Sequence, residues 1–166
     1  YLPSFAVVTE GKHSEVAVAR NLRLEAGTIL VIDRGYNDYA WFAEMTREGV
    51  FFVTRMKTNT VYRVEGDCDI PARGDVLRDQ IISLPALDKA SEEPVLFRRI
   101  EYWNPDKREI LVFLTNLLHL SATTIAAIYK DRWQVELFFK ALKQTLKVKT
   151  FLGTSANAVK TQIWTA

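Results

Sequence analysis

The sequence has few of the residues that build disulfide frameworks, zinc sites or nucleotide-binding loops. Cys68 is the only cysteine, so no disulfide can form within the chain, and we expect a reducing compartment. The two histidines, His13 and His119, have no partner at metal-ligand spacing, and we interpret both as surface or capping residues. The sequence contains no GxxxxGK[ST] loop, so it gives no support for ATP use.

Long apolar runs are also missing. The longest, "ILVFLTNLLHL" at residues 110–120, is too short to span a bilayer and is interrupted by Asn116 and His119. Hydrophobic residues make up 48% of the 166 residues and charged residues 25%, which is an ordinary globular composition. We therefore expect a soluble domain with a real core and no membrane association.

Positive charge is concentrated in the last part of the chain. The formal net charge is only +2, yet residues 129–166 carry 7 Lys and Arg against 2 Asp and Glu. Such a segment is compatible with a polyanionic partner such as nucleic acid. A solvated basic helix face explains the same charges, so both interpretations stay open at this point.

The first 56 residues alternate between apolar strands and amphipathic helices. The stretch "TILVID" at 28–33 shows almost no alternation, which is typical of a central strand covered on both faces. Asp38 is expected to cap the helix that follows, and Gly49 to end it. The order strand, helix, strand, helix, strand predicts an α/β layered core. We expect strands at 2–10, 28–33 and 50–56, and helices at 14–25 and 39–48.

Residues 57–109 have a different sequence pattern. Short β-prone pieces alternate with turns that contain Gly or Pro, which favours antiparallel hairpins. A last strand at 108–117 and a long helix capped by Ser121 follow. The sequence thus predicts one composite domain. Residues 1–56 and 110–166 would form its core, and 57–109 a β-rich insertion.

One face of the long helix combines phosphate-friendly side chains with a carboxylate. Tyr129, Arg132, Glu136 and Lys143 fall within about 60° of one another around the helix. Hydroxyl, guanidinium and ammonium groups in a row can grip a nucleic-acid backbone. A carboxylate among them would repel phosphate unless a divalent cation lies between. The alternative is a simple Arg132–Glu136 pair on a solvated helix.

An apolar stripe beside this row is expected to pack the helix against the sheet and so to fix Glu136. It consists of Ile128, Val135, Phe139, Leu142 and Leu146.

Asp33 is the second carboxylate of interest. It ends the strand at 28–33 and is followed at once by "RGY". Functional groups in α/β sheets lie at such strand ends, although an Asp here can also simply cap the turn. Two carboxylates from different elements, beside a row of phosphate-binding groups, indicate Mg²⁺-assisted phosphodiester chemistry. Asp33 and Glu136 are therefore the predicted metal ligands.

The motif "IDRGYNDYAWF", together with Y-x2-R-x3-E-x6-K, resembles bacterial insertion-sequence transposases of the DDE superfamily. More narrowly, it is similar to the branch named for its YREK residues. The resemblance implies a ribonuclease-H-like core with the β-rich insertion between the second and third acidic residues. Asp33 would be the second and Glu136 the third, both ligands of Mg²⁺ or Mn²⁺. Tyr129, Arg132 and Lys143 would hold DNA phosphates.

The same resemblance implies an activity and its partners. Similar enzymes hydrolyse one DNA strand at the element's end and then use the freed 3′-OH for strand transfer. They usually act as dimers on double-stranded DNA, here in the bacterial cytoplasm and on the nucleoid when bound.

The family's first catalytic Asp lies on an upstream strand, and no residue here matches it. We therefore expect a fragment that lacks the first strands of the core, with two of three carboxylates and little or no activity alone. Both ends of the chain also read as cuts through a longer protein. Three alternatives remain: a non-catalytic DNA-binding remnant, a metal-dependent nuclease of the same fold, and a structural α/β domain.

Overall fold

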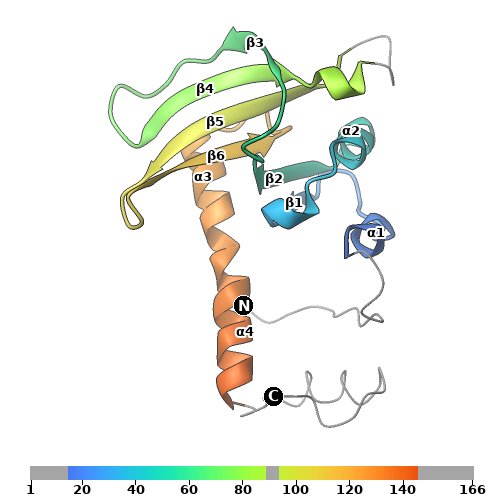
Figure 1. The fold of residues 1–166 in the computed structure, drawn as a ribbon, viewed down its shortest axis with the longest axis vertical. Helices are drawn as coiled ribbons and strands as arrows, with labels where there is room; N and C mark the ends of the chain where they lie inside the picture. The colour runs from blue at the N-terminus through green and yellow to red at the C-terminus, as the bar shows by residue number, and fades with distance from the viewer. Residues whose placement is uncertain (1–14, 89–93, 146–166) are drawn as a thin grey trace.

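The computed structural model describes residues 15–88 and 94–145, which form a mixed six-stranded sheet flanked by helices (Figure 1). The fold class is therefore α/β, as predicted. The strand predicted at 2–10 lies outside the described residues. The strands are β1 (Ile29–Val31), β2 (Phe51–Arg55), β3 (Arg63–Asp67), β4 (Val76–Ser83), β5 (Leu96–Asn104) and β6 (Glu109–Thr115), in the spatial order β1-β2-β6-β5-β4-β3. The helices are α1 (Glu15–Arg20), α2 (Tyr39–Arg47), α3 (Ala122–Asp131) and α4 (Trp133–Thr145), with 3-10 turns η1 (Arg34–Tyr36) and η2 (Pro85–Leu87).

β1 is the outermost strand among the residues that the structure describes, and the strand predicted at 2–10 lies outside them, so the central position predicted for 28–33 stays a prediction. β1 has three residues, pairs in parallel with β2, and leaves Ile29 41% exposed. The lack of alternation has the predicted cause, which is that both faces of the strand are covered. Leu30 and Ile32 pack against one core cluster and Val31 against the other, so apolar residues are needed on both faces of the strand.

The segment 57–109 forms antiparallel hairpins, as predicted, and these hairpins continue the main sheet. β3 pairs with β4, β4 with β5, and β5 with β6, all antiparallel. β6 in turn pairs with β2. The sheet is therefore continuous across both expected boundaries, near residues 56 and 110.

Helices α2 and α3 cover opposite faces of the sheet. Side chains alternate between the faces along each strand, so Phe52 and Leu114 point toward α2, whereas Val53 and Phe113 point toward α3. The two core clusters thus share strands β2 and β6. A change in either strand is felt on both faces.

Local capping follows the sequence closely. Asp38 Oδ1 accepts a hydrogen bond from Trp41 N at 3.1 Å, and Gly49 follows α2 with a φ of 72°, as predicted for a helix end. Ser121 Oγ caps α3 by accepting from Thr124 N at 3.1 Å. The first helix is shorter than the predicted 14–25, because α1 ends at Arg20.

The long helix predicted after Ser121 is interrupted at Arg132. Two i→i−3 hydrogen bonds mark the junction: Arg132 N to Tyr129 O at 3.1 Å and Val135 N to Arg132 O at 3.0 Å. α3 lies against the sheet, and α4 extends beyond it (Figure 1). No helix within the described ranges has the length and apolar character needed to cross a membrane.

This geometry changes the predicted role of the apolar stripe. Val135 is 53% exposed, so it does not pack α4 against the sheet, and that part of the prediction is wrong. Leu146 and the side chains of Phe139 and Leu142 lie outside what the structure describes. Ile128, in α3, does pack against the core cluster that holds Phe113 and Tyr129.

Candidate functional site

Asp33 stands directly after β1 and uses its two carboxylate oxygens differently. Oδ1 accepts a hydrogen bond from Gly35 N at 2.9 Å, which caps the η1 turn. Oδ2 lies 3.7 Å from Arg132 Nη1 on the other side of the site. The side chain is 53% exposed, so it remains open to a ligand. Asp33 thus caps its turn, as the simpler interpretation held, and also faces the helical junction.

The loop after Asp33 is fixed to β2 by Asn37, which the sequence interpretation missed. Asn37 Nδ2 donates to Arg55 O at 2.8 Å, and its Oδ1 accepts from Thr54 Oγ1 at 2.9 Å. Lys57 Nζ donates to the Asn37 carbonyl at 3.3 Å. These partners are 17 to 20 residues away in the sequence. The only feature of the sequence that pointed to Asn37 was its closeness to "DRGY".

Arg132 connects the two predicted ligands. Its Nη2 lies 2.7 Å from Glu136 Oε1, within one turn of helix, while Nη1 faces Asp33. The Arg132 side chain is 16% exposed, whereas the Glu136 side chain is 49% exposed. The structure therefore brings the Asp33 and Glu136 side chains to the same Arg132 guanidinium. The plain i,i+4 pair is present too, as part of this larger arrangement.

Tyr129 lies behind the guanidinium and does not face solvent with it. The residue is 2% exposed, its ring centre is 5.0 Å from that of Phe113, and the Arg132 guanidinium carbon lies 5.3 Å from the ring centre. Its hydroxyl has no hydrogen-bond partner in the described part of the chain. Burial raises the pKa of Tyr129, and the Arg132 charge partly opposes that rise. The Tyr129 ring fills the core between α3 and the sheet, and its predicted contact with phosphate stays a prediction.

Lys143 belongs to α4, but its side chain lies outside the described part of the structure. Its predicted contact with phosphate stays a prediction.

The chemistry of the donors suits a hard divalent cation. Mg²⁺ binds through one or two carboxylates and completes its shell with water and phosphate oxygens. Asp33 and Glu136 offer such oxygens, and the Arg132 guanidinium occupies the place of positive charge next to them. Within residues 15–88 and 94–145, no group of three or more His, Cys, Asp or Glu side chains could hold a metal ion.

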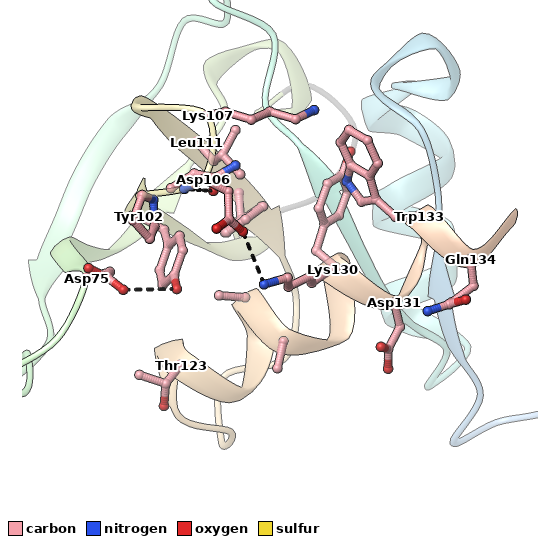
Figure 2. A pocket seen from close by; sticks show the side chains of 16 residues that line it. Asp75, Tyr102, Asp106, Lys107, Leu111, Thr123, Lys130, Asp131, Trp133 and Gln134 are labelled. Atoms are coloured by element: carbon pink, nitrogen blue, oxygen red, sulfur yellow. Dashed lines mark hydrogen bonds and ion pairs between the residues drawn. The ribbon is translucent and has the colours of Figure 1, made fainter. Parts of the chain in front are cut away.

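A cavity of about 760 Å³ lies beside this site, between the β5–β6 turn and the junction of α3 with α4 (Figure 2). Asp33 and Glu136 do not line it. Lys130 contacts Asp106 at 3.5 Å, and Lys107 Nζ lies 3.4 Å from the centre of the Trp133 ring. Its lysines thus already have partners within the protein.

Comparison with known proteins identifies a family over almost the whole chain. Residues 2–166 match the family model described as "Transposase DDE domain". The chain is 34% identical over 168 residues to "Putative transposase y4zB" of Sinorhizobium fredii, covering 99% of this chain and 47% of that protein. It is 33% identical over 167 residues to "Probable transposase for insertion sequence element IS5377" of Geobacillus stearothermophilus, covering 99% and 43%. The chain therefore spans less than half the length of these relatives. It belongs to the transposase DDE domain family.

Proposed function

We propose that this chain is the catalytic-core part of a DNA transposase with a ribonuclease-H-like fold. The parent protein would hydrolyse one DNA strand in a metal-dependent step and then join the freed 3′-OH to target DNA. Family membership supports the class of reaction. The single observation that carries the site is the meeting of Asp33, after β1, and Glu136, in α4, at one guanidinium.

Asp33 and Glu136 would hold Mg²⁺ or Mn²⁺. When bound, the ion would polarise the scissile phosphate and lower the pKa of the attacking water. Asp33 is oriented for this role by the Gly35 hydrogen bond and by the Asn37 anchor on β2. Arg132 and Lys143 would neutralise phosphate charge. Tyr129 would act by supporting the Arg132 guanidinium from behind.

The reaction class calls for a third carboxylate. No third acidic, His or Cys side chain joins Asp33 and Glu136 among the residues that the structure describes. We expect the isolated chain to bind metal weakly and to cleave little DNA. Cleavage and strand transfer, with a dimer on two DNA ends in the bacterial cytoplasm, are proposed for the parent protein.

The test uses the full-length parent protein and DNA carrying an element end. Asp33→Asn and Glu136→Gln should each lower the Mg²⁺-dependent cleavage rate at least about 100-fold, because each removes a charged ligand. DNA affinity should change little. Asp131→Asn is the matched control, since Asp131 is exposed, ends α3 and lines the neighbouring cavity. Full cleavage by either ligand variant contradicts the proposal.

A second candidate is a DNA-binding remnant without catalysis. The pairing of both carboxylates with Arg132 favours it, because the guanidinium partly offsets their charge and α4 otherwise carries only the basic residues Lys140 and Lys143. In that case the parent protein binds DNA without any divalent ion and cuts none. Cutting without joining would indicate a nuclease of the same fold.

A further inference from the structure

We infer that Arg132 is a positioning residue that serves as an internal counter-ion. It holds the Asp33 and Glu136 carboxylates together in the metal-free chain and releases them when a divalent cation binds. The inference rests on the proposed function, because it takes these two carboxylates as the metal ligands.

The position of Arg132 suits a bridge between elements. It lies at the end of α3, where the helix is interrupted, and both terminal nitrogens point to carboxylates: Nη1 to Asp33 at 3.7 Å and Nη2 to Glu136 at 2.7 Å. Without it, the two carboxylates would lose the cation that they share. The planar, always charged guanidinium can pair with both at once, which a lysine ammonium cannot do with the same geometry.

Metal binding and this bridge exclude each other. Mg²⁺ holds its oxygen ligands at about 2.0–2.1 Å, so two carboxylates on one ion must come much closer together than they do across a guanidinium. The ion and the guanidinium would also repel each other at that distance. Arg132 must therefore leave at least one carboxylate before Asp33 and Glu136 can share an ion.

The bridged state leaves one donor unused. Arg132 Nε is buried and has no hydrogen bond of good geometry within the described residues, although the nearby Tyr129 hydroxyl helps to raise the pKa of the guanidinium. A buried donor without an acceptor is unfavourable, so the bridge is not the arrangement that satisfies every group of this side chain.

Release of Arg132 therefore couples the binding of the divalent cation to the binding of DNA. A bound cation frees the guanidinium, and the freed guanidinium can pair with a DNA phosphate. By thermodynamic reciprocity, DNA that captures Arg132 raises the affinity of the carboxylates for the cation by the same factor.

The test is Mn²⁺ binding to the 166-residue chain, measured from the electron paramagnetic resonance signal of the free ion. Arg132→Gln should tighten Mn²⁺ binding on the order of tenfold, which corresponds to about 1.4 kcal/mol. Arg34→Gln is the matched control. Arg34 is exposed, adjacent to Asp33 and carries the same charge, but it does not touch either carboxylate in the described structure. It should leave the affinity within about twofold of the original.

Unchanged or weaker Mn²⁺ binding by Arg132→Gln would overturn the inference, and so would equal tightening by Arg34→Gln. The Asp33→Asn variant distinguishes a failure of the counter-ion role of Arg132 from a failure of the metal-ligand assignment. Weaker binding by Asp33→Asn without tightening by Arg132→Gln leaves the ligand assignment intact and removes only the counter-ion role. Undiminished binding by Asp33→Asn refutes the ligand assignment and the inference with it.

A second readout is the melting temperature with and without Mn²⁺. Mn²⁺ should raise it more in Arg132→Gln than in the original chain, because the variant starts with two unneutralised carboxylates. If Arg132→Gln fails to fold, Arg132→Lys carries the test, since it keeps the charge and the apolar stem but cannot pair with both carboxylates. Arg132→Lys should then also bind Mn²⁺ more tightly, and an unchanged affinity counts against the inference.

Discussion

Arg98 and Asp79 form a buried two-point ion pair between β5 and β4. Arg98 Nε donates to Asp79 Oδ1 at 2.7 Å and Nη2 to Oδ2 at 2.5 Å, with the two side chains 8% and 0% exposed. Arg98 Nη1 also donates to the carbonyls of Leu117, Leu118 and Leu120. This pair therefore ties the strands of the 57–109 segment to the loop that leads into α3 and the candidate site.

Asp79→Asn should lower the free energy of unfolding by about 3–5 kcal/mol, because it leaves the Arg98 charge buried without its partner. Denaturation by urea, followed by circular dichroism, measures this. Asp88→Asn is the control, since Asp88 pairs with Arg63 at 2.8 Å near the surface and should cost no more than about 1 kcal/mol. Equal losses in the two variants would show that the Arg98 pair has no special structural role.

Asn116 joins β6 to the end of α2 and the start of β2. Its Oδ1 accepts from Phe52 N at 2.9 Å, and its Nδ2 donates to Val50 O at 2.9 Å and Thr46 Oγ1 at 3.0 Å. Asn116→Ala leaves buried backbone groups without partners and should cost about 2–4 kcal/mol of unfolding free energy. The same denaturation experiment on Asn59→Ala, at an exposed turn, should show almost no change. A small loss for Asn116→Ala would contradict this account.

Tyr129→Phe distinguishes a packing role from contact with phosphate. The Tyr129 hydroxyl is buried and has no hydrogen-bond partner in the described chain, so its removal should leave stability and DNA affinity almost unchanged. Tyr129→Ala should cost about 3–5 kcal/mol, because it opens a cavity beside Phe113 and under Arg132. Fluorescence anisotropy with labelled DNA measures the affinity. A clear loss of affinity in Tyr129→Phe would favour a direct phosphate contact.

Alkaline pH should destabilise the protein through Tyr129. Burial raises the pKa of this side chain above its ordinary value of 10.0, so the folded state favours the neutral phenol. Stability is then fully retained below pH 10.0 and falls as the pH rises from there through the folded pKa. Melting temperatures between pH 8 and pH 11.5 should fall less steeply in Tyr129→Phe. Parallel curves for the two proteins would mean that Tyr129 does not titrate in this way.

Short-range patterns in the sequence were enough for the local elements. Asp38, Gly49 and Ser121 determine where helices begin or end, because their effects act within three or four residues. The turns of the 57–109 segment predict its hairpins for the same reason. Helical spacing also placed Arg132 next to Glu136, since Arg132 keeps helical backbone angles at the interruption and the i,i+4 spacing is local.

Tertiary structure decided everything that depends on long-range pairing. The pairing of β1 with β2, the burial of Tyr129 and the anchoring of Asn37 all involve partners that the local sequence cannot identify. Asp33 and Glu136 are 103 positions apart, and only the packing of α3 on the sheet carries Arg132 within reach of both. The sequence by itself determined which side chains could bind a cation or a phosphate. Their arrangement around one guanidinium was decided by the fold, because backbone pairing and core packing set the distances between them.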